Sequence, residues 1–193
     1  LHREKNAQND LKQYLRDYPY TTYFSSVQTM IGVLQVEKLR YKNAEKTFNK
    51  VDWKQLGRDE QPVFFFYRGL AYLKQDQFKE ASSCFKALRD TDSPYAIQGK
   101  FYYAYSWYLL GEYDKALPDL LALEHSTEYK DIAPYLVTQI YYAQHQIQLA
   151  EPRAHQLLAQ DPNNKNNGEM QRILGEIAYN AGRYEETVER LTS

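Results

Sequence analysis

Apolar residues recur along most of the chain at the three- and four-residue spacing of an amphipathic helix. One such segment covers residues 65–72, and comparable segments alternate with short polar stretches elsewhere in the sequence. This spacing places the apolar side chains on one face of a helix. Glycine (8 residues) and proline (7 residues) are scarce, so the turns that connect short strands are few. The pattern therefore predicts an all-α protein.

The helical segments form a repeat. An aromatic residue is followed after three positions by alanine and after four more by a large apolar residue, as in Tyr41, Ala44 and Phe48. The alanine position, taken by threonine in the last copy, returns every 34 to 37 residues, as Ala7, Ala44, Ala81, Ala116, Ala150 and Thr187. A mostly small residue precedes it by twelve positions in five copies, as Gly32, Gly69, Ala104, Thr138 and Gly175. A period this regular predicts a helical solenoid.

Each repeat is expected to be a helix–turn–helix unit. The small residue of the first helix and the alanine of the second mark a close approach of two backbones, since larger side chains would push the helices apart. Gly111 and Gly182 stand between the two helices, and glycine accepts the left-handed conformation that ends a helix. No unit can bury its apolar face alone, so neighbouring units stack on one another.

The repeat positions predict one continuous domain over residues 1–193. Residues 4–17 are interpreted as the second half of a repeat, and five units follow at 22–53, 62–91, 94–126, 131–161 and 167–193. The sequence begins at Leu1 and stops inside a helical pattern, so we interpret it as a fragment of a longer array.

The fourth unit is the least regular of the five. His145 replaces the turn glycine, and Pro152 stands near the start of the second helix. A proline deep inside a helix removes a hydrogen bond and crowds the preceding turn. We therefore expect this helix to start late.

These repeats resemble the tetratricopeptide repeat (TPR) family, whose pattern is W-x₂-L-G-x₂-Y…A-x₃-F…P. The best copy keeps Gly69, Tyr72, Ala81 and Phe85, and it departs from the pattern in having Phe65 in place of tryptophan and Arg68 in place of leucine. The resemblance implies an α–α superhelix of about five repeats. The tyrosine-rich segments also look like the long TPR proteins of bacterial cell envelopes. Together with the single cysteine, this favours a bacterial periplasm or cell envelope.

Charge and composition exclude several classes of function. A net charge of −1 gives no electrostatic basis for binding nucleic acid, and the single Cys84 excludes an internal disulfide and a cysteine zinc site. No apolar run approaches the roughly 20 residues of a membrane span. No two of the four histidines stand at a helical metal-ligand spacing, and no phosphate-binding or nucleophile-elbow motif occurs. We expect no catalysis, no cofactor and no metal.

The resemblance implies a groove that binds a partner. In TPR proteins the first helix of each repeat lines a concave surface, and the register places twelve residues of this chain there: Phe66, Tyr67, Leu70, Phe101, Tyr102, Tyr105, Tyr108, Tyr135, Gln139, Tyr142, Arg172 and Tyr179. Tyrosine offers a large contact area with few rotatable bonds. We therefore expect a protein scaffold that holds an extended peptide or an amphipathic helix of a protein partner.

Several alternatives remain open at this stage. The chain is either such a scaffold, an architectural spacer within a longer repeat protein, or a recognition module attached to an enzyme or sensor elsewhere. The tyrosines themselves either line the groove or fill the space between helices, and lipid or glycan binding is a more distant reading. Exposed repeat ends also lead us to expect self-association.

Overall fold

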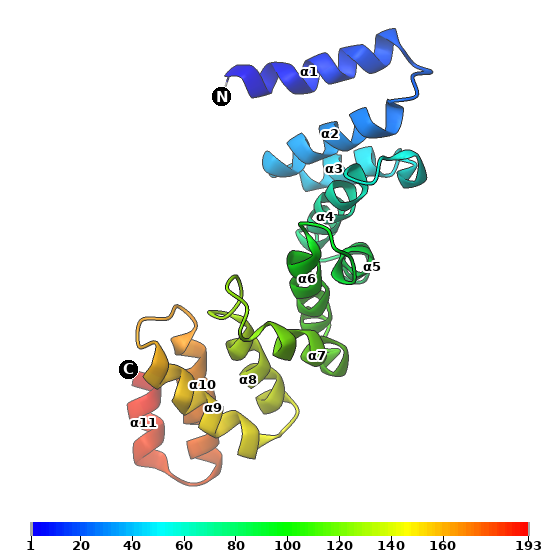
Figure 1. Ribbon diagram of the computed structural model, residues 1–193. Coiled ribbons are helices and arrows are strands. Elements are labelled where there is room, and N and C mark those ends of the chain that lie inside the picture. Colours follow the sequence, from blue (N-terminus) through cyan, green and yellow to red (C-terminus); the bar gives the residue numbers. More distant parts are fainter. Residues whose placement is uncertain (1, 193) are drawn as a thin grey trace. The chain divides into compact units, whose positions relative to one another are not determined.

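The computed structural model describes residues 2–192, with side chains described for residues 7–185 and 187–190. Over this range all regular secondary structure is helical (Figure 1). The elements are α1 (His2–Asp17), α2 (Phe24–Glu37), α3 (Tyr41–Phe48), the 3₁₀ helix η1 (Trp53–Gln55), α4 (Glu60–Leu73), α5 (Phe78–Arg89), α6 (Ala96–Leu109), α7 (Tyr113–Leu123), α8 (Ala133–Ala143), α9 (Ile147–Gln160), α10 (Asn167–Asn180) and α11 (Tyr184–Thr192).

Each predicted repeat range corresponds to a pair of consecutive helices, although α4 begins at Glu60, two residues before its predicted range. The pairs are α2 with α3, α4 with α5, α6 with α7, α8 with α9 and α10 with α11, and α1 precedes them as a single helix. The predicted fold class, all-α with about five helix–turn–helix repeats, is therefore confirmed. Residue 193, the end of the last predicted range, lies outside the described residues. That all five repeats form one continuous domain stays a prediction.

The turn between the two helices keeps one geometry in every repeat. A residue with positive φ stands two positions before the second helix each time: Leu39, Asp76, Gly111, His145 and Gly182. In the first turn the Leu39 amide donates to Val36 and the Arg40 amide donates to Gln35, both at 2.8 Å. These two bonds define the Schellman motif that closes a helix. The fourth turn makes the same two bonds, from the His145 amide to Tyr142 and from the Gln146 amide to Tyr141, although it has no glycine.

Glycine marks the close approach of two helices in the first two repeats. A Cβ atom at Gly32 would lie 2.4 Å from Cε1 of Phe48, and one at Gly69 would lie 2.7 Å from Cε1 of Phe85. Both phenylalanines are fully buried. The alanines of the second helices, Ala44 to Ala150 in the repeat series, are fully buried as well. The small residues thus leave the space that these two aromatic rings fill.

The expectation for the second helix of the fourth repeat is wrong. This helix, α9, begins at Ile147 and continues through Pro152, which is exposed. An exposed proline directs its ring and its missing amide hydrogen bond toward solvent, where water can hydrate the opposed carbonyl. Pro118 stands at the corresponding place inside α7. The helix therefore accepts this residue without a late start.

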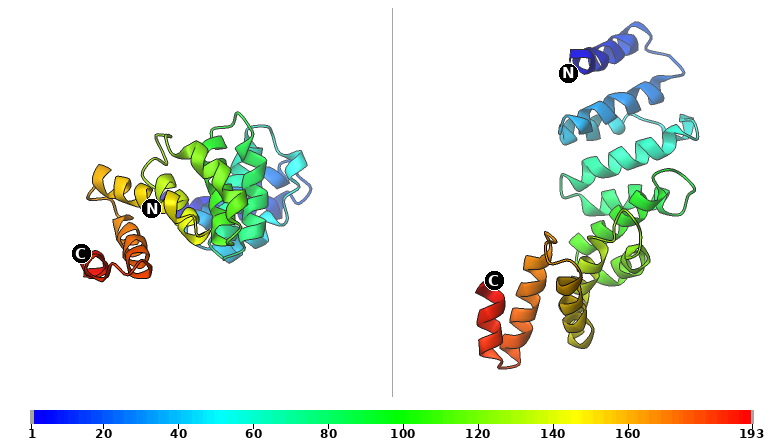
Figure 2. Two further views of the ribbon diagram at one scale, coloured as in Figure 1. Left: turned by 90° about the horizontal axis from the view of Figure 1, so that it is seen from below. Right: turned by 60° about the vertical axis from the view of Figure 1, so that its left-hand side comes forward.

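The chain divides into two compact units, residues 1–111 and 112–193, which are described separately. In the first unit α1 packs on α2, α2 packs on α3 and α4, and α5 packs between α4 and α6. The right-hand view of Figure 2 shows α1, α2 and α4 side by side, one after another. Buried clusters around Phe48 and Phe64 and around Phe85 and Leu88 help to hold the unit together.

The second unit is built from α7 to α11 in the same way. Helix α8 packs on α7 and α9, α9 packs on α10, and α10 packs on α11. Its core joins α8, α9 and α10 through the buried residues Tyr135, Ala154, Leu157, Met170, Ile173, Leu174 and Ile177. Helix α10 supplies most of these side chains, so the second unit is organised around it.

Candidate interaction surface

The twelve predicted groove residues fall into two sets. Seven lie on α4 and α6 in the first unit, and five lie on α8 and α10 in the second. Within each unit, several of these side chains contact one another or a neighbouring helix, as described below. A single groove that runs past all twelve stays a prediction.

In the first unit Phe66 connects α4 with α6. Its ring centroid lies 4.7 Å from that of Tyr95 and 6.0 Å from that of Tyr102, and it meets Tyr67 edge-on at 5.5 Å. Tyr102 in turn stacks on the buried Phe85 at 5.2 Å. Phe66, Leu70 and Tyr102 are half-buried, and they pack against the cluster around Phe85. These side chains therefore serve mainly to hold helices together.

A short ladder of rings follows one face of α6. Phe101 and Tyr105 stack at 5.7 Å with an interplanar angle of 8°, and Tyr105 and Tyr108 stack at 5.9 Å with an angle of 13°. Phe101 is only 5% exposed, so the prediction that it lines a groove is corrected: it packs in the interior. Tyr105 and Tyr108 are half-buried and present part of their surface to solvent.

Tyr67 and Tyr102 are neutral near physiological pH. Burial raises the pKa of the Tyr67 hydroxyl, and the neighbouring Tyr95 and Glu37 raise it further. Burial also raises the pKa of Tyr102, with a smaller contribution from Tyr105. Their hydroxyl groups can therefore both donate and accept hydrogen bonds.

In the second unit Tyr135 belongs to the core. Its side chain is 2% exposed, and its hydroxyl donates to Oδ1 of Asn167 at 3.2 Å. This bond ties α8 to the start of α10. The predicted place of Tyr135 in a groove is corrected accordingly, because a side chain this deeply packed offers a partner no surface.

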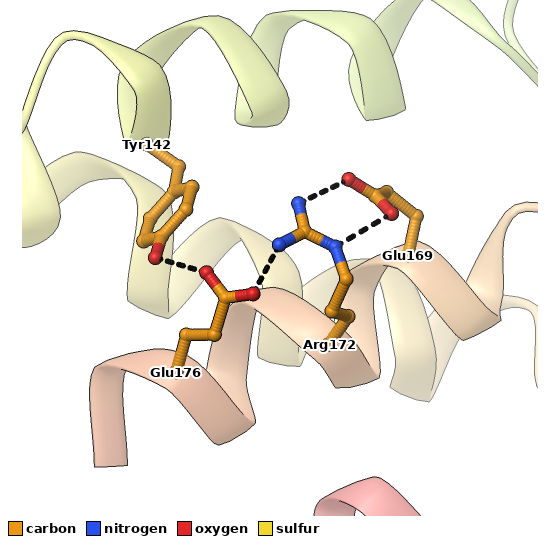
Figure 3. Close-up of polar contacts among 4 residues, drawn as sticks. All are labelled: Tyr142, Glu169, Arg172 and Glu176. Atoms are coloured by element: carbon orange, nitrogen blue, oxygen red, sulfur yellow. Dashed lines mark hydrogen bonds and ion pairs between the residues drawn. The ribbon is translucent and has the colours of Figure 1, made fainter. Parts of the chain in front are cut away.

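Tyr142, Glu176, Arg172 and Glu169 form a polar chain between α8 and α10 (Figure 3). The Tyr142 hydroxyl donates to Glu176 at 2.5 Å, and the other oxygen of Glu176 accepts from the Arg172 guanidinium. Glu169 accepts two further bonds from Arg172, at 2.6 and 3.0 Å. Arg172, a predicted groove residue, is exposed, and two carboxylates of its own helix neutralise its charge.

The pKa values in this chain follow from the contacts. Burial, and then the bond to Glu176, raise the pKa of Tyr142 to about 12. The Tyr142 hydroxyl and the Arg172 guanidinium lower the pKa of Glu176, although burial opposes them. Glu176 is therefore ionised and Tyr142 protonated at neutral pH, which is the charge state that the chain of bonds requires.

The remaining two predicted residues are Gln139 and Tyr179. Gln139 on α8 is half-buried, whereas Tyr179 near the end of α10 is 61% exposed. The Tyr179 ring meets Tyr184 of α11 edge-on at 5.8 Å. Tyr179 is thus the most accessible aromatic side chain of the twelve predicted residues.

A hollow that the sequence analysis missed lies at the other end of the chain. It has a volume of about 430 Å³ and is lined by α1, α2 and α4 through Leu11, Ser26, Thr29, Met30, Val33, Leu34, Glu37, Asp59, Glu60 and Val63. The signal was present, because Gly32 stands in its repeat where Gly69 stands in the next. Carrying the groove register to the first repeat gives Ser26, Thr29, Met30, Val33, Val36 and Glu37, and all of these except the buried Val36 line the hollow.

The thiol of Cys84 is buried. Burial raises the pKa of the Cys84 thiol to about 11, so the reactive thiolate is scarce at neutral pH. Among the side chains that are described, no group of three or more histidine, cysteine or acidic residues is placed to hold a metal ion. Over the same residues, no helix has the length and apolar character needed to cross a membrane.

Repeated helix pairs, left-handed turns at equivalent positions and glycines under buried rings define a helical repeat protein. The family model for the tetratricopeptide repeat matches residues 68–129 and 139–187, which is more than half of the chain. The chain therefore belongs to the tetratricopeptide repeat family. No curated protein matches it.

Solved structures of other repeat proteins share this fold. MamA from strain AMB-1 is similar with a TM-score of 0.68 and 16% identity, over 87% of this chain and 88% of that one. YrrB, described as a TPR protein with an unusual peptide-binding site, gives a TM-score of 0.67 and 16% identity over 94% and 89%. A kinesin light chain of Podospora anserina with TPR-like repeats gives 0.64 and 16% over 90% and 94%. At this identity the similarity shows the fold.

Proposed function

We propose that this chain is a non-enzymatic scaffold that holds a protein or peptide partner through its tyrosine-rich surface. The observation that carries the proposal is the set of partly exposed tyrosines on first helices of a TPR solenoid: Tyr67, Tyr105 and Tyr108 in the first unit and Tyr179 in the second. Rings that are already packed against their neighbours lose little conformational entropy when a partner covers them. YrrB, with the same fold, has a peptide-binding site.

The geometry narrows the predicted residue set. Phe101 and Tyr135 are buried, and Arg172 is held by its own helix, so we propose that these three support the surface rather than contact the partner. Tyr142 is engaged with Glu176 and is assigned the same supporting role. The proposed contact residues are Tyr67, Tyr105, Tyr108 and Tyr179.

The test is photo-crosslinking in a lysate of the source organism. Benzoylphenylalanine, which preserves an aromatic ring, replaces Tyr108 in one variant and Tyr179 in a second. A matched control carries it at Tyr18, which is 60% exposed and lies outside the proposed surface. We expect a discrete adduct from Tyr108 or Tyr179 that is absent from Tyr18, with circular dichroism confirming that all three variants are folded.

A second measurement asks whether the partner needs the tyrosines. In a pull-down, the double variant Tyr105→Leu and Tyr108→Leu keeps apolar bulk but removes the rings and hydroxyls. Loss of the crosslinked partner from this variant supports the proposal. Capture that is unchanged would contradict it, and capture of nothing by the unmodified chain would favour the architectural spacer. The partner's identity also tests the proposed periplasmic or cell-envelope location.

A further inference from the structure

We infer that the hollow formed by α1, α2 and α4 is a docking site for a basic amphipathic helix. Its residues on α2 stand at the groove positions of the first repeat, and the hollow lies wholly within the first unit, apart from the proposed tyrosine contacts. The inference therefore rests on the proposed function and deepens it by naming the chemistry of a partner. Three features of the hollow identify the occupant. Its floor is apolar, its polar side chains already have hydrogen-bond partners, and the charged residues around it are acidic.

The floor of the hollow is apolar and partly open to solvent. Leu11, Met30, Val33, Leu34 and Val63 come from three different helices, and Met30 is 51% exposed. An apolar patch that three helices shape into a hollow is typical of a surface that a partner covers. Methionine has three rotatable bonds and a polarisable sulfur, so it adapts its shape to an incoming side chain.

The polar groups in the floor favour a helix over an extended peptide. The Thr29 hydroxyl donates to the Ser25 carbonyl of its own helix at 2.9 Å, and the Ser26 hydroxyl donates to Glu60 at 3.0 Å. The walls are helices whose backbone groups bond internally. An extended peptide would bury its own amides and carbonyls here without partners, which is costly. A helix satisfies its backbone internally and presents only side chains.

The charged residues of the lining indicate the charge that a partner should carry. Glu37, Asp59 and Glu60 line the hollow, and among the side chains that the structure describes no lysine, arginine or histidine joins them. Glu37 and Asp59 are exposed, while Glu60 accepts bonds from the Gly57 amide at 2.8 Å and from Ser26. Carboxylates of one sign around an apolar floor complement lysine or arginine flanking an apolar stripe, and they repel an acidic helix.

The dimensions fit about three turns of helix. The lining residues of α2 run from Ser26 to Glu37, a rise of about 17 Å at 1.5 Å per residue. A partner helix of that length presents apolar residues at positions i, i+3 or i+4, and i+7. Leucine at these positions with lysine on both flanks is therefore the matching chemistry.

The probe is a fluorescein-labelled peptide of about 18 residues, long enough to form a helix on binding, with this leucine and lysine pattern. Fluorescence anisotropy measures its Kd for the whole chain at about 50 mM and about 300 mM salt. A scrambled peptide of the same composition and a version with glutamate in place of lysine are the controls. We expect the patterned basic peptide to bind at least about tenfold more tightly than either control at low salt.

Variants of the chain assign the binding to the hollow. Met30→Gln is expected to weaken the patterned peptide about tenfold at both salt concentrations, since it removes apolar contact. Leu39→Gln, on a more exposed apolar residue outside the lining, is expected to leave Kd unchanged. Glu37→Lys with Asp59→Lys is expected to reverse the preference, so that the glutamate peptide becomes the better ligand.

Each contrary result overturns the inference. The inference is wrong if the scrambled peptide binds as tightly as the patterned one, or if the patterned peptide does not bind. It is also wrong if Met30→Gln leaves Kd unchanged, or if the double lysine variant does not reverse the charge preference. If sedimentation shows a dimer that Met30→Gln converts to a monomer, the occupant is a second copy of the chain and the inference is wrong. None of these results changes crosslinking at Tyr108 or Tyr179, so the proposed function is tested separately.

Discussion

Gly32 lies so close to the buried ring of Phe48 that its helix has no room there for a side chain. Two effects oppose each other when alanine replaces it. Alanine favours the helix by about 1 kcal/mol, but its Cβ would lie 2.4 Å from the ring, and overpacking of a core costs about 1–3 kcal/mol. Because Phe48 is fully buried and cannot swing into solvent, the steric cost dominates.

We therefore expect Gly32→Ala to lower the free energy of unfolding, by about 1–2 kcal/mol in urea titrations. Gly168→Ala is the matched control, since a Cβ at Gly168 would have no atom within 4 Å, and it should be neutral or stabilising. Adding Phe48→Leu to Gly32→Ala should recover part of the loss through a coupled double-mutant cycle. A Gly32→Ala variant as stable as the parent would contradict this account of the packing.

Tyr142 and Glu176 set a dependence of stability on pH. Tyr142→Phe removes the hydroxyl that bonds Glu176, and we expect a loss of about 1 kcal/mol at neutral pH. The pKa of Glu176 lies below its ordinary value of 4.5, so the unfolded chain binds more protons below pH 4.5 and stability falls as pH decreases. Because the Tyr142 bond is the largest cause of this shift, the variant should lose less stability in acid than the parent.

At basic pH the dependence of stability on pH has the opposite sign. The pKa of Tyr142 is raised from 10.0 to about 12, so between these values the folded chain holds a proton that the unfolded chain has lost. Stability contributed by Tyr142 therefore declines as pH rises through this range. Urea titrations at neutral pH, below pH 4.5 and above pH 10 measure both limbs. Parallel curves for Tyr142→Phe and the parent would show that the pair does not govern the pH dependence.

At the scale of the element, the turns between paired helices all require a left-handed residue. Three of the five carry a residue other than glycine, although a side chain in this conformation costs about 1–2 kcal/mol. Leu39 is 71% exposed, so its side chain gains little packing in return. Glycine at the same place removes the cost without disturbing a core.

We expect Leu39→Gly to raise the melting temperature, with a gain of about 0.5–1 kcal/mol in the free energy of unfolding. The reverse change, Gly182→Ala, puts a side chain at a φ of 77° and should destabilise by a similar amount. Thermal unfolding followed by circular dichroism compares the two variants with the parent. A destabilised Leu39→Gly would mean that the leucine side chain makes a contact worth more than the strain.

At the scale of the whole molecule, a repeat protein couples each helix pair mainly to its neighbours. The buried clusters around Phe48 and Phe85 belong to the first unit, and the cluster around Tyr135 and Ile173 belongs to the second. A change that damages one cluster should therefore leave the protection of distant helices largely intact.

Hydrogen exchange read by mass spectrometry tests this for Gly32→Ala. We expect faster exchange in α2, α3 and α4, and unchanged exchange in α8, α9 and α10. Equal loss of protection in both units would show that the chain unfolds as one cooperative body, in agreement with the single continuous domain predicted from the repeat.

The fold could be predicted because its signals are local and repeat. The position of Gly69 twelve residues before Ala81, and of Phe85 four residues after it, recurs with enough regularity to place helices, turns and packing sites. The sequence pattern was less informative where the effect of a residue depends on whether its side chain faces solvent. Pro152 is tolerated in α9 because it faces outward, which its position in the sequence does not reveal.

The candidate surface could be predicted only in outline. The register identified the helices that carry it, but the same tyrosine pattern includes the buried Tyr135 and the exposed Tyr179. It also includes Arg172, whose charge is neutralised by Glu169 and Glu176, one turn away on either side. The hollow between α1, α2 and α4 depends on side chains from three helices, which no single repeat contains.

The sequence by itself determined the all-α fold, the repeat length and the residues at which paired helices touch. These features follow from the spacing of apolar residues and from side-chain size. Both are properties of one or two helical turns, so they can be recognised in a single sequence. Only the tertiary structure decided which tyrosines remain accessible, which charges are already paired and where an apolar hollow opens. Each of these depends on how closely neighbouring helices approach, and that distance is set by packing across the whole unit.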